Sequence, residues 1–186
     1  MQTKTTIAQG LVLLILAALI VQPAFPRDLP PPPSGFSWQE VPELKAAFLK
    51  PSGWFFKREK QEGTLAYFIT KEDIDRNGRF QTGLTVNVFR LKKDSAVERG
   101  QGLIENIAKP RHGEMWTEQA GVLQKFGCLV KNTDANGTIV MQALAVANTK
   151  TNTLYFFIFE SPEPEWNDAW KAGKQIMDAL IIDEGI

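Results

Sequence analysis

The sequence contains very few of the side chains from which most catalytic and metal sites are built. Its 186 residues include one histidine, His112, and one cysteine, Cys128. A structural zinc site needs four ligands, usually Cys and His, and a Ser-His-Asp or Cys-His arrangement would have to use His112, near which no nucleophile motif occurs. Gly-rich phosphate loops, CxxC pairs and nucleophile elbows are also missing. We therefore predict a protein that is not an enzyme, with no catalytic residues, no metal ligands and no cofactor.

The two rare side chains have ordinary explanations. Cys128 has no cysteine to pair with and lies in the apolar run 126–130, so we expect a buried, unreactive thiol. His112 follows Pro110 in a polar stretch that is typical of an exposed loop. Weak binding of a divalent metal by His112 with Glu114 stays open, but a plain loop histidine is the preferred interpretation.

The chain also has no excess of positive charge. Lysine and arginine together number 21, and aspartate and glutamate together number 21. A protein that binds nucleic acid normally presents an excess of Lys and Arg on one face. We therefore do not expect nucleic acid as a partner.

The N-terminal 24 residues have the pattern of an export segment. Lys4 supplies a small positive region, and residues 10–21 are uninterrupted apolar sequence, which is the length of a signal-peptide core and shorter than the roughly 20 residues of a membrane-spanning helix. Cleavage after Ala24 would place Gln22 at position −3, where a small residue is preferred. Residues 1–24 are therefore predicted to be a signal peptide or, if uncleaved, an N-terminal membrane anchor. The expected location is the periplasm, a thylakoid lumen or the outer face of a membrane.

A proline-rich linker is predicted at residues 25–35. Four consecutive prolines occupy positions 30–33. Such a stretch forms an extended, semi-rigid polyproline helix rather than part of a core. Proline-rich runs are also ligands of recognition domains, but beside an export segment a spacer is the better interpretation.

Residues 36–186 are predicted to form one domain. An Asn136-Gly137 turn and a short loop at 61–63 indicate hairpins, and residues 111–125 have no clear pattern. Consecutive strands with hairpin connections predict an α+β fold, an α/β/α sandwich in which a central antiparallel sheet of about six strands is flanked by helices. Strands are expected at 54–60, 64–70, 84–91, 128–133, 138–147 and 154–159, and helices at 94–109 and from 166 over about sixteen residues.

One loop resembles part of a calcium site. Asp73, Asp75 and Asn77, followed by Gly78, match positions 1, 3, 5 and 6 of an EF-hand loop. Position 12 should be a bidentate glutamate and is Leu84. Asp, Asn and Gly are also the residues that a turn between strands requires, so a turn is preferred and weak calcium binding stays open.

The chain resembles the PsbP-like family, which includes the extrinsic lumenal protein of photosystem II. The similarity covers about residues 36–183. It implies a central antiparallel sheet between helices and a non-enzymatic protein that docks on a larger assembly, although proteins with this fold also occur outside photosynthesis. The residues that carry it are Ala47–Trp54, Tyr67–Asp73, Thr82–Val88 and Glu160–Pro162 leading into Trp166 and Trp170.

These features favour an exported binding or assembly protein that docks on a membrane-associated protein complex. A link to photosystem II is expected only if the source is photosynthetic, and an uncleaved N-terminal segment would add contact with the membrane. The alternative is a carrier of a small molecule or lipid in the periplasm or lumen, which would need an apolar pocket between the sheet and a helix. An enzyme would need titratable groups that converge in a cleft. A cytosolic adaptor, a role also known for this fold, is opposed by the N-terminal segment.

Overall fold

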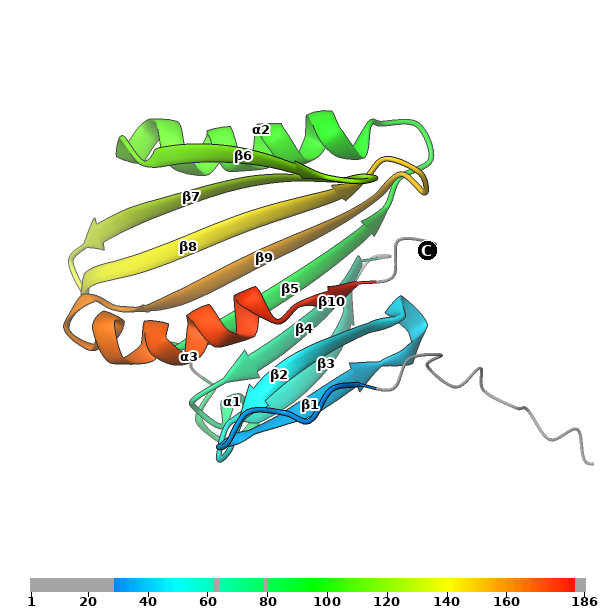
Figure 1. Ribbon diagram of the computed structural model, residues 1–186. Helices are drawn as coiled ribbons and strands as arrows, with labels where there is room; N and C mark the ends of the chain where they lie inside the picture. Colours follow the sequence, from blue (N-terminus) through cyan, green and yellow to red (C-terminus); the bar gives the residue numbers. More distant parts are fainter. Residues whose placement is uncertain (1–28, 62–63, 79, 183–186) are drawn as a thin grey trace, which may run out of the picture.

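A computed structural model describes residues 29–61, 64–78 and 80–182, so the predicted signal or anchor segment lies outside the described residues. The main element is a seven-stranded sheet in which every neighbouring pair is antiparallel (Figure 1). In sheet order its strands are β3 (Phe55–Gln61), β4 (Thr64–Thr70), β5 (Gly83–Arg90), β9 (Thr153–Pro162), β8 (Gly137–Asn148), β7 (Leu123–Asp134) and β6 (Glu114–Ala120).

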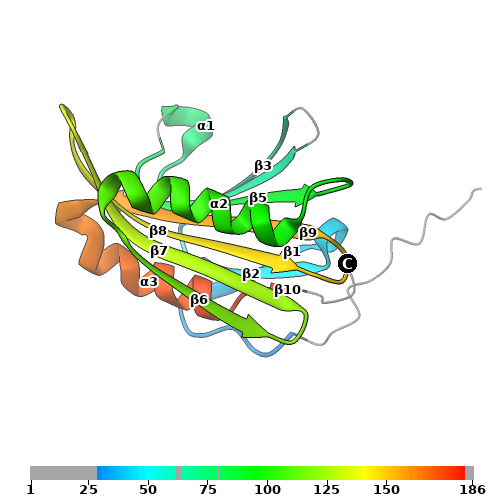
Figure 2. The same ribbon diagram turned by 90° about the horizontal axis from the view of Figure 1, so that it is seen from above.

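The two faces of this sheet are covered differently. Helix α2 (Ala96–Ala108) packs on one face (Figure 2). The other face carries helix α3 (Trp166–Asp178) and a small second sheet. The second sheet consists of β1 (Phe36–Val41), β2 (Ala46–Pro51) and β10 (Ile181–Ile182), in the order β1-β2-β10. The result is a layered α+β sandwich. Its short helices are η1 (Pro42–Leu44), α1 (Ile74–Asn77), η2 (Lys109–Arg111) and η3 (Glu163–Glu165).

Helix α2 follows directly from its sequence. The Ser95 hydroxyl caps it by accepting a hydrogen bond from the backbone N–H of Glu98 at 3.3 Å. Four residues at a spacing of four, Ala96, Gly100, Ile104 and Ala108, are buried against the sheet. The small residues in this stripe bring the helix axis close to the strands, and Pro110 prevents a further turn of α-helix.

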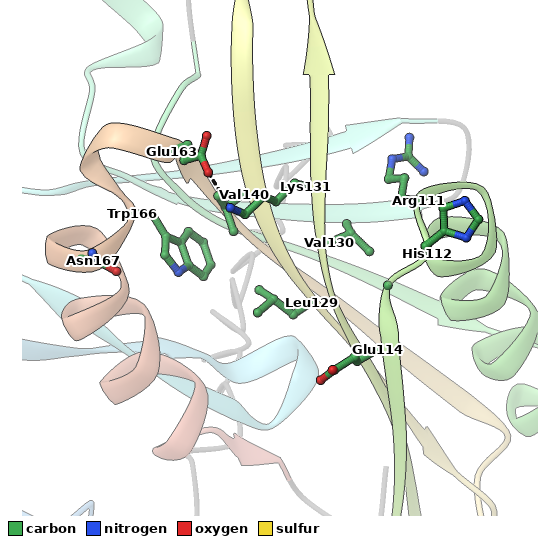
Figure 3. A pocket seen from close by; sticks show the side chains of 11 residues that line it. Arg111, His112, Glu114, Leu129, Val130, Lys131, Val140, Glu163, Trp166 and Asn167 are labelled. Atoms are coloured by element: carbon green, nitrogen blue, oxygen red, sulfur yellow. Dashed lines mark hydrogen bonds and ion pairs between the residues drawn. The ribbon is translucent and has the colours of Figure 1, made fainter.

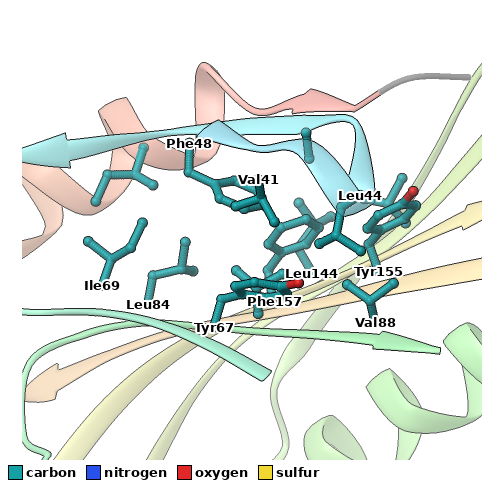
Figure 4. Close-up of a cluster of buried hydrophobic side chains, with 14 of the residues drawn as sticks. Val41, Leu44, Phe48, Tyr67, Ile69, Leu84, Val88, Leu144, Tyr155 and Phe157 are labelled. Atoms are coloured by element: carbon teal, nitrogen blue, oxygen red, sulfur yellow. The ribbon is translucent and has the colours of Figure 1, made fainter. Parts of the chain in front are cut away.

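Two apolar clusters fill the space on either side of the sheet. On the α3 side, Phe48 of β2 contacts Phe157 of β9 edge-on, with ring centroids 6.4 Å apart (Figure 4). On the α2 side, Ile104 packs with Phe126 of β7 and Phe156 of β9. Strand β9 is therefore buried on both faces, as its uninterrupted apolar sequence predicted.

The fold class is confirmed, with corrections to the strand count. The main sheet has seven strands instead of about six, and β7 begins at Leu123 instead of 128. The unassigned stretch 111–125 contains β6, whose seven residues are all exposed, so no apolar alternation marks it. Strands β1 and β2 were not predicted either. Strand β2 is buried at nearly every position, so its sequence shows no period of two. In the described part, no helix has the length and apolar character needed to cross a membrane.

Candidate docking site

The structure gives the two rare side chains no catalytic setting. Cys128 is fully buried beneath α2, and this burial raises the pKa of its thiol, so the nucleophilic thiolate is disfavoured as predicted. His112 is exposed on the turn after η2 with a φ of 51°. Within the described ranges, no three His, Cys, Asp or Glu side chains come together as a metal site would require.

The loop that resembles a calcium site forms the one-turn helix α1. The Asp73 side chain caps it by accepting a hydrogen bond from the backbone N–H of Arg76 at 3.3 Å. The Asp75 carboxylate forms an ion pair of 2.7 Å with Lys57 on β3. Both carboxylates therefore have partners within the protein, and the loop has the turn geometry preferred from its sequence.

The Asn136-Gly137 step likewise lies in a hairpin turn, between β7 and β8. Asp134 accepts a hydrogen bond from the backbone N–H of Asn136 at 2.7 Å. Gly137 has a φ of 128°, which residues with a side chain rarely adopt. The predicted turn is confirmed, and it explains the Asn-Gly pair by backbone geometry.

A hollow of about 490 Å³ lies between the start of α3 and the outer strands of the sheet (Figure 3). Trp166, Leu129 and Val140 supply apolar surface, whereas the remaining lining is mostly charged or polar. Lys131 and Glu163 close one side with an ion pair. The other polar residues of the lining are Arg111, His112, Glu114 and Asn167.

Trp166 is held rigidly at this hollow by an aromatic stack. Its ring lies parallel to that of Trp170 one turn later, with centroids 5.1 Å apart. Both rings also contact Phe159 of β9, at 5.9 and 5.5 Å. The aromatic stripe of the last helix is therefore core packing, as expected, and it fixes one wall of the hollow.

Beyond the hollow, the same face of the sheet continues uncovered over β7 and β6. Trp116 of β6 lies opposite Gly127 of β7, and a Cβ atom at Gly127 would lie 2.2 Å from the indole ring. The ring thus lies directly over the glycine, in space that any side chain at position 127 would fill. Glu118 beside it is paired with Lys125 at 3.2 Å.

Exposed apolar side chains gather at this edge of the sheet. Of the four large hydrophobic residues that are exposed in the described part, three lie here: Met115 at 49%, Trp116 at 41% and Leu129 at 46%. The fourth, Phe55, lies on β3 at the opposite edge. We call Met115, Trp116 and Leu129, together with strand β6, the β6 surface. Sequence reasoning missed it, although a Met-Trp pair in a stretch without a buried partner pattern was the available signal.

Comparison with known proteins supports the fold. No protein-family model matches the chain, and no curated protein matches it in sequence. Among solved structures, it is similar to a cyanobacterial PsbP from Synechocystis, with 11% identity and a TM-score of 0.51 over 82% of this chain and 95% of that one. It is also similar to the Ran-binding protein Mog1p of Saccharomyces cerevisiae, with 15% identity and a TM-score of 0.49 over 79% and 95%. The chain has the PsbP-like fold, and the resemblance seen in its sequence is confirmed at that level.

Proposed function

We propose that the chain is an exported, non-enzymatic docking protein that binds a membrane-associated protein complex through the β6 surface. The observation that carries this proposal is the exposure of three large apolar side chains at the β6 edge in the described part of the chain, with Trp116 and Leu129 on the α3 face and Met115 on the opposite face. Exposed apolar residues that occur singly are ordinary, whereas neighbouring ones with a polar rim, as Trp116 and Leu129 are, favour an interaction site. Tryptophan and methionine are also enriched in the cores of protein interfaces.

The predicted tether supports a role beside a membrane. Its described end lies against the domain, where the carbonyl oxygen of Pro30 accepts a hydrogen bond from the indole N–H of Trp38 at 2.7 Å. The four prolines at 30–33 begin at this contact, and such a stiff segment would fix how the chain leaves the domain toward a preceding anchor. If the source is photosynthetic, photosystem II is the first complex to test, because of the fold.

A carrier of small ligands is the second candidate. The hollow beside α3 has a volume within the roughly 300–1,000 Å³ range of ligand sites. Four charged side chains line this hollow, however, and the apolar layers on both sides of the sheet are filled by side chains. The proposed docking function therefore agrees better with the structure.

Site-specific photocrosslinking tests the docking function. A benzoyl-phenylalanine replaces Trp116 in the full chain, and the matched control replaces Phe55, which is equally exposed at the opposite edge. In membranes of the source organism, we expect a crosslink to a subunit of a membrane complex from position 116 only. Leu129→Glu should abolish this crosslink, while Phe55→Glu should leave it intact. Equal crosslinking from both positions, or none from position 116, would contradict the proposal.

A further inference from the structure

A comparison of the two edge strands of the main sheet, β6 and β3, indicates how the β6 surface binds a partner. Strand β6 is the last strand beside β7, and the pairing runs without a bulge from Glu114 opposite Leu129 to Ala120 opposite Leu123. The outer edge of a terminal strand presents unpaired N–H and C=O groups. Natural proteins usually protect such an edge with charged side chains, especially lysine, or with proline, a bulge or a covering segment. Strand β6 has no lysine, arginine, proline or bulge, and its only charged side chains are Glu114 and Glu118.

The opposite edge strand, β3, carries these protections. It contains Lys57, Arg58 and Lys60. Lys57 forms an ion pair with Asp75 of α1 at 2.7 Å, and Arg58 forms one with Glu43 of η1 at 2.9 Å. Positive charge and neighbouring segments thus guard one edge, whereas the other carries two glutamates, of which Glu118 is paired with Lys125, and two large exposed apolar side chains. The contrast within one sheet indicates that the β6 edge is kept free for pairing.

The side chains on the two faces of β6 determine which side chains an added strand should carry. The face shared with α3 carries Glu114, Trp116 and Glu118 at alternate positions. A strand placed alongside would favour basic side chains opposite the two glutamates and an apolar side chain opposite Trp116. The other face carries Met115, Thr117 and Gln119, which make no charge demand.

A second copy of this chain does not meet these demands. An antiparallel pairing of two β6 strands about Thr117 would place Glu118 of each copy opposite Trp116 and diagonal to both Glu114 and Glu118 of the other. Four carboxylates would then share one face of a small interface, with Lys125 of each copy as the nearby cation. Diagonal neighbours lie within reach of long side chains, so this accumulation of like charge disfavours the pairing.

We infer that the partner adds an extended strand of about seven residues to the β6 edge, with basic and apolar side chains alternating on its α3-side face. This inference rests on the proposed docking function. Backbone hydrogen bonds to the free groups of β6 supply the pairing, and Glu114, Trp116 and Glu118 select the sequence. A strand of this length spans about 24 Å, which matches β6 from end to end.

Synthetic heptapeptides with blocked ends provide a direct test on the full chain. The basic probe is Val-Thr-Lys-Thr-Val-Thr-Lys, which places lysine opposite both glutamates, and the acidic probe has glutamate in place of lysine. Binding is measured by NMR titration together with amide hydrogen exchange of residues 114–120. We expect the basic probe to bind about tenfold more tightly, because two cross-strand pairs change from attraction to repulsion in the acidic one.

Two further probes report on the backbone. One carries N-methyl groups on its threonine amides and the other on its valine and lysine amides, so the side chains are unchanged. In an antiparallel edge pairing, alternate residues point their N–H groups at the neighbour, so only one of the two should lose binding. Glu114→Lys should weaken binding of the basic probe about threefold, whereas Glu40→Lys, an exposed position on β1, should leave it unchanged.

The results separate this inference from the docking function. Preference for the basic probe, with slowed exchange at 114–120 and loss through one methylation pattern, supports strand addition. Equal binding of both charged probes, no slowed exchange, or no effect of either methylation pattern overturns it. A dimeric free chain with slow exchange at 114–120 also overturns it, in favour of a second copy. A crosslink from position 116 would still support docking in each of these cases.

Discussion

Replacing Gly173 with alanine tests how tightly α3 is seated on the sheet. Glycine inside a helix normally costs stability, and Gly→Ala at an open position stabilises a protein by about 0.5–1 kcal/mol. Gly173 is buried against β9, and an added Cβ would lie 2.7 Å from two ring atoms of Phe159 and 2.8 Å from the ring of Trp170. Phe159 is fully buried and cannot move aside, so overpacking of about 1–3 kcal/mol outweighs the gain in helix propensity.

The expected net loss for Gly173→Ala is about 1–2 kcal/mol, which corresponds to a Tm lower by about 2–8 °C for a chain of this size. Gly102 of α2 is the matched control, because an added Cβ there meets nothing within 4 Å. Gly102→Ala should therefore raise the Tm by about 1–4 °C. Calorimetry and urea unfolding of both variants measure the difference.

A third variant sharpens the comparison. At Gly100, an added Cβ would lie 3.1 Å from Cδ1 of Leu154, a tight contact with the end of a side chain, so the result should fall between the other two. If Gly173→Ala were as stable as the unchanged protein or more stable, the close packing of α3 against Phe159 would be contradicted. A loss at Gly102 equal to that at Gly173 would show that helix propensity and packing had been weighed wrongly.

Two further predictions concern ionisable groups, the buried Cys128 thiol and the partly buried Glu160 carboxyl. Because Cys128 is fully buried and burial raises the pKa of its thiol, a disulfide reagent should label it slowly in the native protein and at once in urea; equal rates would place it at the surface. Burial also raises the pKa of the Glu160 carboxyl in the native state. Between the pKa of the unfolded state and that of the native state, the native state therefore binds more protons, so the free energy of unfolding falls as pH rises through that window. Glu160→Gln should therefore be more stable than the unchanged protein at about pH 7 and lose this advantage near pH 4, as measured by urea unfolding; the opposite pH trend would contradict the burial of the carboxyl.

The local sequence pattern was sufficient to predict the elements that have a clear apolar period. The last helix was predicted from the repeat of Trp166, Ala169, Trp170 and Gly173, because one helix face must pack on the sheet. Strand β5 was predicted from the alternation of Leu84, Val86 and Val88, which are all buried on the α3 side. The buried thiol and the Asn-Gly turn also followed from local chemistry.

The candidate site was not predictable in the same way. Strand β6 is exposed on both faces, so nothing in its own sequence distinguishes it from a loop, and only its pairing with β7 makes it a strand. Strand β2 is buried almost throughout and has no period, because both its neighbours and the main sheet cover it. For β2 these contacts come from β10 and the main sheet, which are distant in the chain, whereas β6 pairs with the adjacent strand β7 and shows no apolar pattern because both its faces are exposed.

The sequence by itself determined the fold class, an α+β domain with consecutive antiparallel strands, and it predicts an export segment and a proline spacer before that domain. Tertiary structure decided which residues meet at the surface. It placed Trp116 on Gly127 and brought Leu129 and Trp166 to the walls of one hollow. In the described part of the chain it also left the β6 edge without a neighbouring strand, while ion pairs guard the β3 edge. The physical reason is that periodicity and turn chemistry act over a few residues, whereas the order of strands in a sheet depends on burial summed over the whole domain.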